Sequence, residues 1–363
     1  MKILTVVGAR PQFIKAGPFS RAVRERHTEI LVHTGQHYDA QLSDVFFEEL
    51  GLPRPDHHLG VGSGPHGRQT AQMLERLEDV MRRESPDAVV IYGDTNSTLA
   101  GALAAAKLGI PVAHVEAGLR SFVRDMPEEI NRIVADRVST WLFAPTETAI
   151  ENLRREGCAV DGERDRVPGP GVAHLTGDIM YDALMQQSAI ADDRSHVLAR
   201  MRLEPGGYVL ATVHRASNTD DVSRLAEIFD AMALLHEPVI VPLHPRTKAA
   251  LLGTDIEVEL PVRLVDPVGY LDMLQLQRNA RLVLTDSGGV QKEAYLLGVP
   301  CVTLRDETEW PETLADEWNV LAGADCERIL RAARRPRPTG DVPQVFGDGH
   351  AAERMVGLLE AGA

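Results

Sequence analysis

The sequence predicts an α/β protein with two Rossmann-like domains, each a doubly wound parallel sheet. The first observation is segment 86–120, where a valine-rich strand, an alanine-rich helix and a second apolar strand follow one another. The second is that such strands and helices alternate along nearly all of the 363 residues. The third is that this alternation starts afresh after residue 202, and the length suffices for two separate cores.

The composition is that of an acidic globular protein, with 44% hydrophobic and 25% charged residues and a formal net charge of -15. This charge argues against nucleic acid or an anionic membrane as a partner, so an anionic ligand must be met by a few local cations. The 3 cysteines form no C-x-x-C pair and fit unpaired thiols in a reducing cytosol. The N-terminus becomes polar after about seven residues and no apolar run reaches membrane length, so we expect a cytoplasmic protein.

The first domain is expected to span residues 1–177. Proline and glycine end the apolar runs, and proline-free periodic stretches between them predict helices. The strands are predicted at 2–7, 29–34, 87–92, 112–115, 140–145 and 172–176, and the helices at 39–50, 68–83, 96–107, 146–155 and from about 126. Segments 51–67 and 161–170 are predicted to be loops.

The second domain is expected to span residues 178–340, followed by a C-terminal segment, 341–363, that contains a final helix near 351–359. Its strands are predicted at 208–213, 239–243, 263–265, 281–285 and 301–304. Two such domains are expected to face each other across a cleft, which is the default place for a ligand.

Two carboxylates follow neighbouring strands of the first domain. Asp94 comes after strand 87–92, and Glu116 comes directly after strand 112–115. Strands joined by a helical crossover are parallel, so their carboxyl ends open on the same edge of the sheet. Ligands of such sheets bind at that edge, which makes this pair a candidate for acid and base chemistry. The alternative for Asp94 is that it caps the following helix.

The loop after the first strand carries two cations. Arg10 lies in the loop, Pro11 suits the first helical position, and Lys15 follows one turn into the helix. Cations beside a helix N-terminus favour an anion there, although such residues are often simply solvated. The chain has no G-x-G-x-x-G and no G-x-x-x-x-G-K-S, so a dinucleotide or P-loop nucleotide has no support.

A third carboxylate is expected from the helix that starts near residue 126. Glu128 and Glu129 both lie in its first turn, where the helix dipole favours negative charge whatever the function. The loop that leads to them follows Glu116, so one of the two is a candidate site residue.

In the second domain, Ser287, Gly288 and Gly289 follow a strand and open a helix. The glycines allow backbone N–H groups to approach a phosphate, and Glu293, one turn further, is suited to accept the two hydroxyls of a ribose. The alternative is a simple glycine turn with a solvated glutamate.

Histidines follow two other strands of this domain. His214 with Arg215 comes after strand 208–213, and His244 comes after strand 239–243. Lone histidines at strand ends are often structural, but His214 beside an arginine is a candidate partner for a diphosphate.

Taken together, the segments GARPQFIK, TGQHYD, GDTNST, HVEAGLRS, MPEEINR, TVHR, LHPR and LTDSGGVQKEA resemble the non-hydrolysing UDP-N-acetylglucosamine 2-epimerases in order and spacing. The resemblance implies a fold like the GT-B glycosyltransferases, with the final helix crossing back to the first domain. It also implies conversion of UDP-N-acetylglucosamine to UDP-N-acetylmannosamine through elimination of UDP and re-addition to a 2-acetamidoglucal. No metal or nicotinamide cofactor is expected, and the partners are the UDP-sugar and a second copy in a homodimer.

The resemblance also implies roles for the residues named above. The catalytic residues would be Asp94, Glu116, Glu128 and His214, and the substrate would be bound by Arg10, Lys15, Ser287, Gly288, Gly289 and Glu293. Arg215 and His244 join the expected substrate-binding residues because of their places after strands. Which carboxylate is base and which is acid stays open. Trp310 stands where many members have arginine, and Ser217 where glutamate is usual, so the contacts to UDP are less well defined than the carboxylates.

Other functions remain open. The chain can be an epimerase of UDP-2,3-diacetamido-2,3-dideoxy-glucuronate, a hydrolysing relative that releases N-acetylmannosamine, a glycosyltransferase of the same fold, or a non-catalytic nucleotide-sugar-binding protein. The set of carboxylates argues against a binding protein, because binding alone needs no acid and base beside the sugar.

Overall fold

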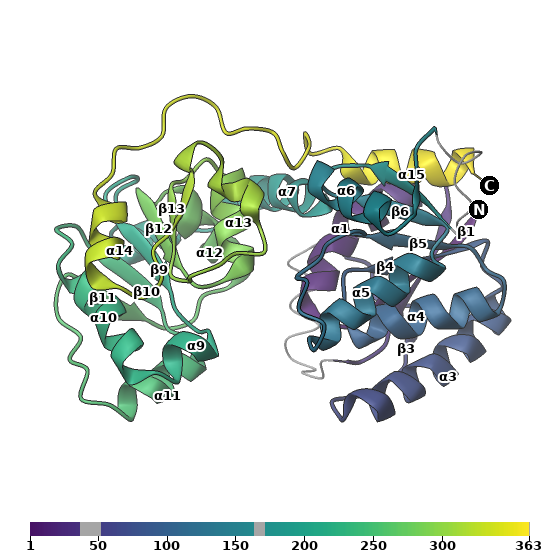
Figure 1. The fold of residues 1–363 in the computed structure, drawn as a ribbon, viewed down its shortest axis with the longest axis horizontal. Coiled ribbons are helices and arrows are strands. Elements are labelled where there is room, and N and C mark those ends of the chain that lie inside the picture. Colours follow the sequence, from purple (N-terminus) through teal and green to yellow (C-terminus); the bar gives the residue numbers. More distant parts are fainter. Residues whose placement is uncertain (37–51, 163–170, 363) are drawn as a thin grey trace. The chain divides into compact units, whose positions relative to one another are not determined.

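The computed structural model describes residues 1–36, 52–162 and 171–362 (Figure 1). The chain folds into two compact units. Unit 1 comprises Met1–Gln186 and Gln344–Ala363, and unit 2 comprises Gln187–Pro343. The sequence predicted the first domain boundary after residue 177. The boundary between the two units lies later, inside helix α7 (Ile179–Arg194).

Unit 1 is built on a parallel sheet with the strand order β3-β2-β1-β4-β5-β6-β8-β7. Helices connect most successive strands, so the sheet is doubly wound, as predicted (Figure 1). The strands are β1 (Lys2–Val7), β2 (Thr28–His33), β3 (His57–His58), β4 (Ala88–Tyr92), β5 (Val112–Val115), β6 (Trp141–Ala144), β7 (Ala159–Val160) and β8 (Val172–Leu175). The helices are α1 (Arg10–Arg24), α3 (His66–Glu84), α4 (Asn96–Lys107), α5 (Pro127–Val138), α6 (Glu147–Arg155) and α15 (Ala351–Ala361).

Small side chains let α4 pack closely on the sheet. Ala100, Ala102, Ala104 and Ala105 are fully buried in the core that α4 shares with β1, β4 and α3. A Cβ atom on Gly101 would come within 3.0 Å of the Ile91 side chain, so no larger residue fits without a shift. The alanine-rich sequence thus serves both helix formation and close contact with the strand that precedes Asp94.

The C-terminal helix α15 belongs to unit 1. The carboxylate of Asp182 accepts hydrogen bonds from the backbone N–H groups of Ala351 (3.1 Å) and Ala352 (2.8 Å) at the start of α15. Near its other end, Glu360 accepts from His27 at 2.8 Å. The last residues of the chain therefore return to the unit that contains the first ones.

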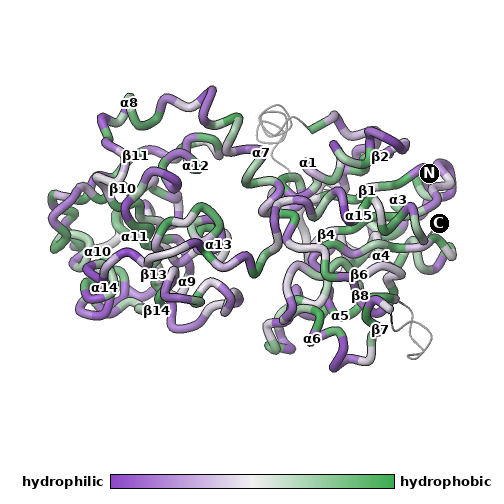
Figure 2. The backbone as a smooth tube through the Cα atoms, turned by 90° about the horizontal axis from the view of Figure 1, so that it is seen from above, coloured by the Kyte–Doolittle hydropathy of each residue, from purple (hydrophilic) through white to green (hydrophobic). Residues whose placement is uncertain are grey.

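Unit 2 has a second parallel sheet with the order β11-β10-β9-β12-β13-β14. Its strands are β9 (Val209–Thr212), β10 (Val239–Pro242), β11 (Val262–Val265), β12 (Leu282–Thr285), β13 (Cys301–Thr303) and β14 (Asn319–Leu321). Its helices are α8 (Val197–Met201), α9 (Ala216–Thr219), α10 (Val222–Ala233), α11 (Pro245–Leu252), α12 (Tyr270–Arg278), α13 (Gly288–Leu296), the 3-10 helix η1 (Pro311–Glu317) and α14 (Cys326–Ala333). Hydrophobic and hydrophilic stretches alternate along the backbone of both units, as amphipathic elements around buried sheets require (Figure 2).

Every strand predicted from the sequence is present, with ends that differ by about one residue. The short strands β3, β7 and β14 were not predicted, because two or three residues carry too little pattern. The first of them lies within the predicted loop 51–67. The predicted helix 39–50 and most of the predicted loop 161–170 lie outside the described residues. No described helix is long and apolar enough to cross a membrane.

Candidate active site

In unit 1, the strand order reverses direction between β1 and β4. The chain leaves β1 for β2 on one side, and it leaves β4 for β5 on the other. At such a point the loops after the two strands diverge, and open α/β sheets bind ligands in the crevice between them. Asp94 follows β4, Glu116 follows the neighbouring β5, and α1 with Lys15 follows β1. The sheet topology therefore brings these three predicted residues to one edge.

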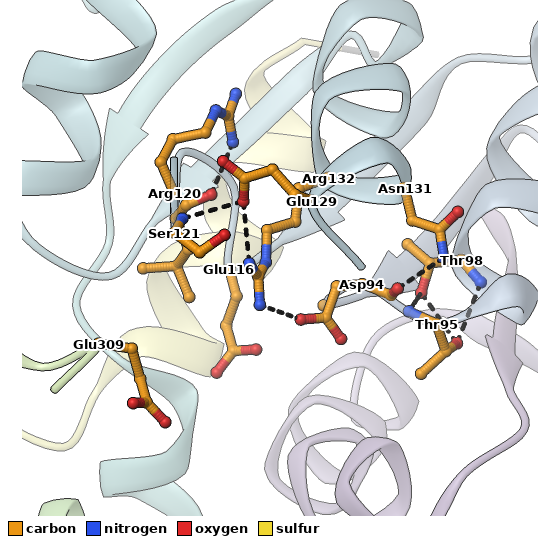
Figure 3. Close-up of polar contacts among 12 residues, drawn as sticks. Asp94, Thr95, Thr98, Glu116, Arg120, Ser121, Glu129, Asn131, Arg132 and Glu309 are labelled. Atoms are coloured by element: carbon orange, nitrogen blue, oxygen red, sulfur yellow. Dashed lines mark hydrogen bonds and ion pairs between the residues drawn. The ribbon is translucent and has the colours of Figure 1, made fainter. Parts of the chain in front are cut away.

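Asp94 does not cap the helix that follows it. The N-cap of α4 is Thr95, whose hydroxyl accepts a hydrogen bond from the N–H of Thr98 at 3.3 Å. The Asp94 carboxylate instead forms an ion pair with the guanidinium group of Arg132 on α5 (Figure 3). Because Thr95 caps α4, the Asp94 side chain takes no part in capping and lies at the end of β4, paired with Arg132.

Glu116 lies in a backbone conformation that non-glycine residues rarely adopt. Its φ angle is 66°, and its side chain is buried, with 6% exposure. The carboxylate is paired with the ammonium group of Lys15, and both groups lie against the backbone of Gly93. A strained φ angle at a buried charged residue is a frequent mark of a functional site.

Lys15 is surrounded by carboxylates of unit 1. Burial alone would lower the pKa of its ammonium group, but the nearby carboxylates of Glu116, Asp94 and Asp178 raise that pKa above its usual value. Lys15 is therefore a permanent cation at the edge of the sheet, and Asp178, which the sequence analysis did not select, is one of its neighbours.

The structure separates the two candidate glutamates at the start of α5. Glu129 is buried and accepts hydrogen bonds from the N–H groups of Ser121 (2.9 Å) and Phe122 (3.0 Å), and it also pairs with Arg132 at 3.0 Å (Figure 3). Burial would raise the pKa of Glu129, but these hydrogen bonds together lower it. Glu128 is half-buried, and its side chain has no hydrogen bond or ion pair to another described residue. Glu129 thus holds the loop, and Glu128 is the one available for a ligand.

The loop after β1 is fixed by Gln12. Its side-chain oxygen accepts from the N–H groups of Gly8 (2.8 Å) and Ala9 (3.1 Å), and its amide group donates to the carbonyl of Tyr92 at 2.8 Å. This buried side chain joins the ends of β1 and β4. The backbone of Arg10 starts α1, and the side chain of Arg10 lies outside the described part of the structure.

Unit 2 has a corresponding reversal between β9 and β12, and Asp286 joins the two loops there. Its fully buried carboxylate accepts from the N–H groups of His214 (3.0 Å) and Arg215 (2.9 Å), which follow β9. Asn218 donates to the same carboxylate at 3.1 Å. Asp286, which was not among the predicted site residues, therefore ties His214 and Arg215 after β9 to the end of β12, directly before Ser287.

His244 lies beside His214, with their ring centroids 5.1 Å apart. Its Nδ1 accepts from the N–H of Arg246 at 3.2 Å and so caps α11. Partial removal from water, together with the neighbouring His214, lowers the pKa of His244. The structure thus brings His214, Arg215 and His244 to one end of the sheet.

The predicted serine and glycines lie at the start of α13. Ser287 is the N-cap of this helix, and Gly288 and Gly289 are its first two residues. A Cβ atom on Gly288 would come within 2.0 Å of the Glu309 carboxylate, which also pairs with Arg305 at 2.6 Å. A carboxylate therefore lies against the backbone of Gly288 at the start of the helix.

Glu293 lies within unit 2 and is 9% exposed. Its two oxygens accept from the hydroxyl group of Tyr270 at 3.3 Å and from the side-chain amide of Gln277 at 2.8 Å. These contacts hold the carboxylate in a fixed orientation.

Sequence reasoning missed Arg132, Asp286 and Gln12. Arg132 was within the quoted motif MPEEINR, and the i, i+3 spacing from Glu129 was a usable signal for that pair. Asp286 directly precedes the selected Ser287, at a strand end like Asp94. Gln12 stands at the third position of α1, where a glutamine side chain can accept from the N–H of the N-cap residue, and that spacing was a usable local signal. Only its contact with Tyr92 depends on the sheet.

Two parallel, doubly wound sheets with polar side chains at their reversal points define a GT-B-like α/β protein. The chain belongs to the UDP-N-acetylglucosamine 2-epimerase family, whose sequence model matches residues 21–360.

Three relatives illustrate this membership. The chain is 48% identical over 366 residues to UDP-2,3-diacetamido-2,3-dideoxy-D-glucuronate 2-epimerase of Pseudomonas aeruginosa, covering 99% of each chain. It is 47% identical over 365 residues, again with 99% of each chain covered, to a UDP-N-acetylglucosamine 2-epimerase homolog of Methanococcus maripaludis. The crystal structure of Methanocaldococcus jannaschii UDP-GlcNAc 2-epimerase in complex with UDP-GlcNAc and UDP aligns with a TM-score of 0.84 at 43% identity, over 99% of this chain and 100% of that one.

Proposed function

We propose that this protein is a non-hydrolysing epimerase that inverts C2 of UDP-N-acetylglucosamine to give UDP-N-acetylmannosamine. The observation that carries the proposal is the pair of carboxylates, Asp94 and Glu116, each with its own cation at the reversal point of the first sheet. Family membership supplies the reaction class, and relatives named UDP-N-acetylglucosamine 2-epimerase supply the substrate.

The chemistry explains why the site needs paired carboxylates. The C2 proton of the sugar is weakly acidic, so a base removes it while the C1–O bond to UDP breaks and a C1–C2 double bond forms. UDP then adds back to C1, and an acid delivers a proton to the other face of C2. Because the reaction is reversible, the base of one direction is the acid of the other. We assign these tasks to Asp94, Glu116 and Glu128.

Cations complete the proposed mechanism. The departing diphosphate carries the charge that develops as the C1–O bond breaks, and positive groups stabilise it. We assign this task to Lys15, Arg10, His214 and Arg215, with support from His244. Ser287, Gly288, Gly289 and Glu293 are assigned to the UDP group, since the first turn of α13 is suited to a phosphate and Glu293 to ribose hydroxyls.

Proton NMR of the purified protein with UDP-N-acetylglucosamine in heavy water tests the proposal. We expect deuterium at C2 and a mixed pool of the two epimeric UDP-sugars. Free N-acetylmannosamine with an equal amount of UDP would instead indicate a hydrolysing enzyme. Asp94→Asn and Glu116→Gln should each abolish turnover while UDP still binds, and near-normal rates in both would overturn the assignment of the carboxylates.

A second candidate substrate is UDP-2,3-diacetamido-2,3-dideoxy-glucuronate. It is favoured by the 48% identity to the Pseudomonas aeruginosa enzyme named for that sugar, which exceeds the 43% to the Methanocaldococcus jannaschii enzyme. The two sugars differ at C3, which carries an acetamido group in place of a hydroxyl, and at C6, which is a carboxylate in place of a hydroxymethyl group, whereas the reacting C1 and C2 are the same. The ratio of kcat/KM for the two substrates, measured with one preparation, decides between them.

We also propose a cytoplasmic homodimer. The three free cysteines support a reducing compartment, and the dimer is the expectation from the family. Light scattering coupled to size exclusion measures the mass, which is 39.7 kDa for one chain.

A further inference from the structure

Unit 1 contains a buried histidine, His114, that has no task in the proposed mechanism. His114 is on β5 and is fully buried. Its Nδ1 lies 2.6 Å from Oδ1 of Asp136 on α5, and its Nε2 lies 2.8 Å from the carbonyl oxygen of Gly93. Gly93 is the residue before Asp94, so the ring contacts the backbone that carries one of the proposed catalytic carboxylates.

Asp136 extends these contacts to the loop of the other carboxylate. Its Oδ2 accepts from the N–H of Gly118 at 3.1 Å and pairs with Arg120 at 2.7 Å. Gly118 follows Glu116 by two residues. Its φ angle is 81°, and a Cβ atom there would come within 2.4 Å of a backbone carbonyl of α6, so the loop has little freedom to move. One histidine and one aspartate thus join the loop after β4 to the loop after β5.

The hydrogen-bond partners of the His114 ring determine which of its two nitrogens carry a proton. The Gly93 carbonyl can only accept a hydrogen bond, so Nε2 must donate to it. Asp136 accepts from both Gly118 and Arg120, as an ionised carboxylate does, so Nδ1 must also donate. The charged groups that face the ring are Asp136 directly, then Arg120 with its second partner Glu156. Burial would raise the pKa of Asp136, but His114 and Arg120 lower it, in agreement with an ionised partner.

We propose that His114 is a positioning residue for the epimerisation, which donates hydrogen bonds from both ring nitrogens and so fixes the loops of Asp94 and Glu116 relative to each other. The claim that His114 positions the two loops for catalysis rests on the proposed function. The claim that both of its ring nitrogens donate hydrogen bonds does not. A misplacement of a reacting group by about 1 Å can cost on the order of 10²-fold in rate, so the loss of the His114 contacts should have a measurable effect on kcat.

Two substitutions remove the two contacts separately. In His114→Asn the side-chain amide reaches the place of Nδ1, so the contact with Asp136 is kept and the one with Gly93 is lost. In His114→Gln the longer side chain reaches the place of Nε2, so the contact with Gly93 is kept. We expect kcat to fall about 10²-fold in each variant, with KM and UDP affinity within about threefold of the wild type.

His27 provides the matched control. It is also a histidine of unit 1 bonded to a carboxylate, with its side chain 11% exposed and its Nε2 lying 2.8 Å from Glu360. It lies at the other end of β1 and β2, next to Met1. His27→Asn and His27→Gln should keep the wild-type kcat. A kcat within twofold of the wild type in both folded His114 variants, or an equal loss in the His27 variants, would overturn the positioning role.

An activity-independent measurement keeps the inference separate from the proposed function. In protein labelled with ¹⁵N in histidine, both ring nitrogens of His114 should show a bonded proton, and these signals should be missing from the spectrum of His114→Asn. A single N–H on this ring would refute the double donation. If the wild-type protein epimerises neither UDP-sugar, the proposed function fails. Hydrogen exchange in segments 93–95 and 116–120 then tests the positioning: faster exchange in both His114 variants supports it, and unchanged exchange refutes it.

Discussion

The ammonium group of Lys15 and the carboxylate of Glu116 form an ion pair across 101 residues of sequence. Asp94 is paired in the same way with Arg132. Each of the two proposed catalytic carboxylates of this sheet edge is therefore paired with a cation, and Arg132 also pairs with Glu129. Because the Lys15 and Glu116 side chains are only 14% and 6% exposed, water compensates little when one partner is removed.

Lys15→Met should therefore lower both stability and activity. Removing one partner of a buried ion pair leaves an uncompensated charge, so we expect the free energy of unfolding to fall by about 3 kcal/mol. Loss of a cation near the reacting groups should lower kcat by about 10²-fold or more. Urea unfolding and the NMR assay measure the two effects. Lys107→Met, at the exposed end of α4, is the control, and equal stabilities of the two variants would contradict the prediction.

Glu128→Gln and Glu129→Gln should separate a reacting group from a structural one. The Glu128 carboxylate has no partner among the described residues, so the amide variant should keep the wild-type stability and lose turnover. Glu129 holds two backbone N–H groups and Arg132, so its amide variant should lose about 1–3 kcal/mol of stability. The converse pattern, with an active Glu128→Gln, would exclude Glu128 as the third carboxylate.

Stability should fall in acid because of Glu129 and Asp136. The pKa of each carboxylate is lower in the folded protein than its usual value of 4.5 or 3.8, respectively. Such groups stabilise the fold fully above their unfolded pKa values, and this stabilisation is lost as the pH falls through the folded ones. Urea unfolding between about pH 7 and pH 3 should show a decline that starts near pH 4.5, and a smaller decline in Glu129→Gln. An identical decline in that variant would contradict the assignment.

Gly289→Ala should test the anion site at α13. A Cβ atom on Gly289 would come no nearer than 3.9 Å to another group, so the variant should fold normally and gain slightly in helix stability. If a diphosphate approaches the backbone here, the added methyl group should weaken UDP binding by at least about tenfold, which is 1.4 kcal/mol. Calorimetric titration with UDP measures this. Gly357→Ala on α15, also with open space around it, is the control, and unchanged UDP affinity in Gly289→Ala would place the diphosphate elsewhere.

Much of the fold was predictable because its signals are local. The short apolar runs predict the strands β4 and β5, and the alanine-rich segment predicts α4. The glycines between them predict the turns. Parallel pairing follows from the helical crossover, and it was enough to expect Asp94 and Glu116 at one edge. Lys15 and the residues before α13 were predicted by the same reasoning.

The sequence by itself determined which residue types follow which strands, and so which carboxylates, cations and glycines reach the edges of the two sheets. Only the tertiary structure decided their tasks. Thr95 rather than Asp94 caps α4, Glu129 rather than Glu128 holds the loop, and His114 with Asp136 joins two loops. The physical reason is that strand and helix patterns arise from neighbouring residues, whereas a side chain's task depends on which donors and acceptors folding brings to it from distant parts of the chain.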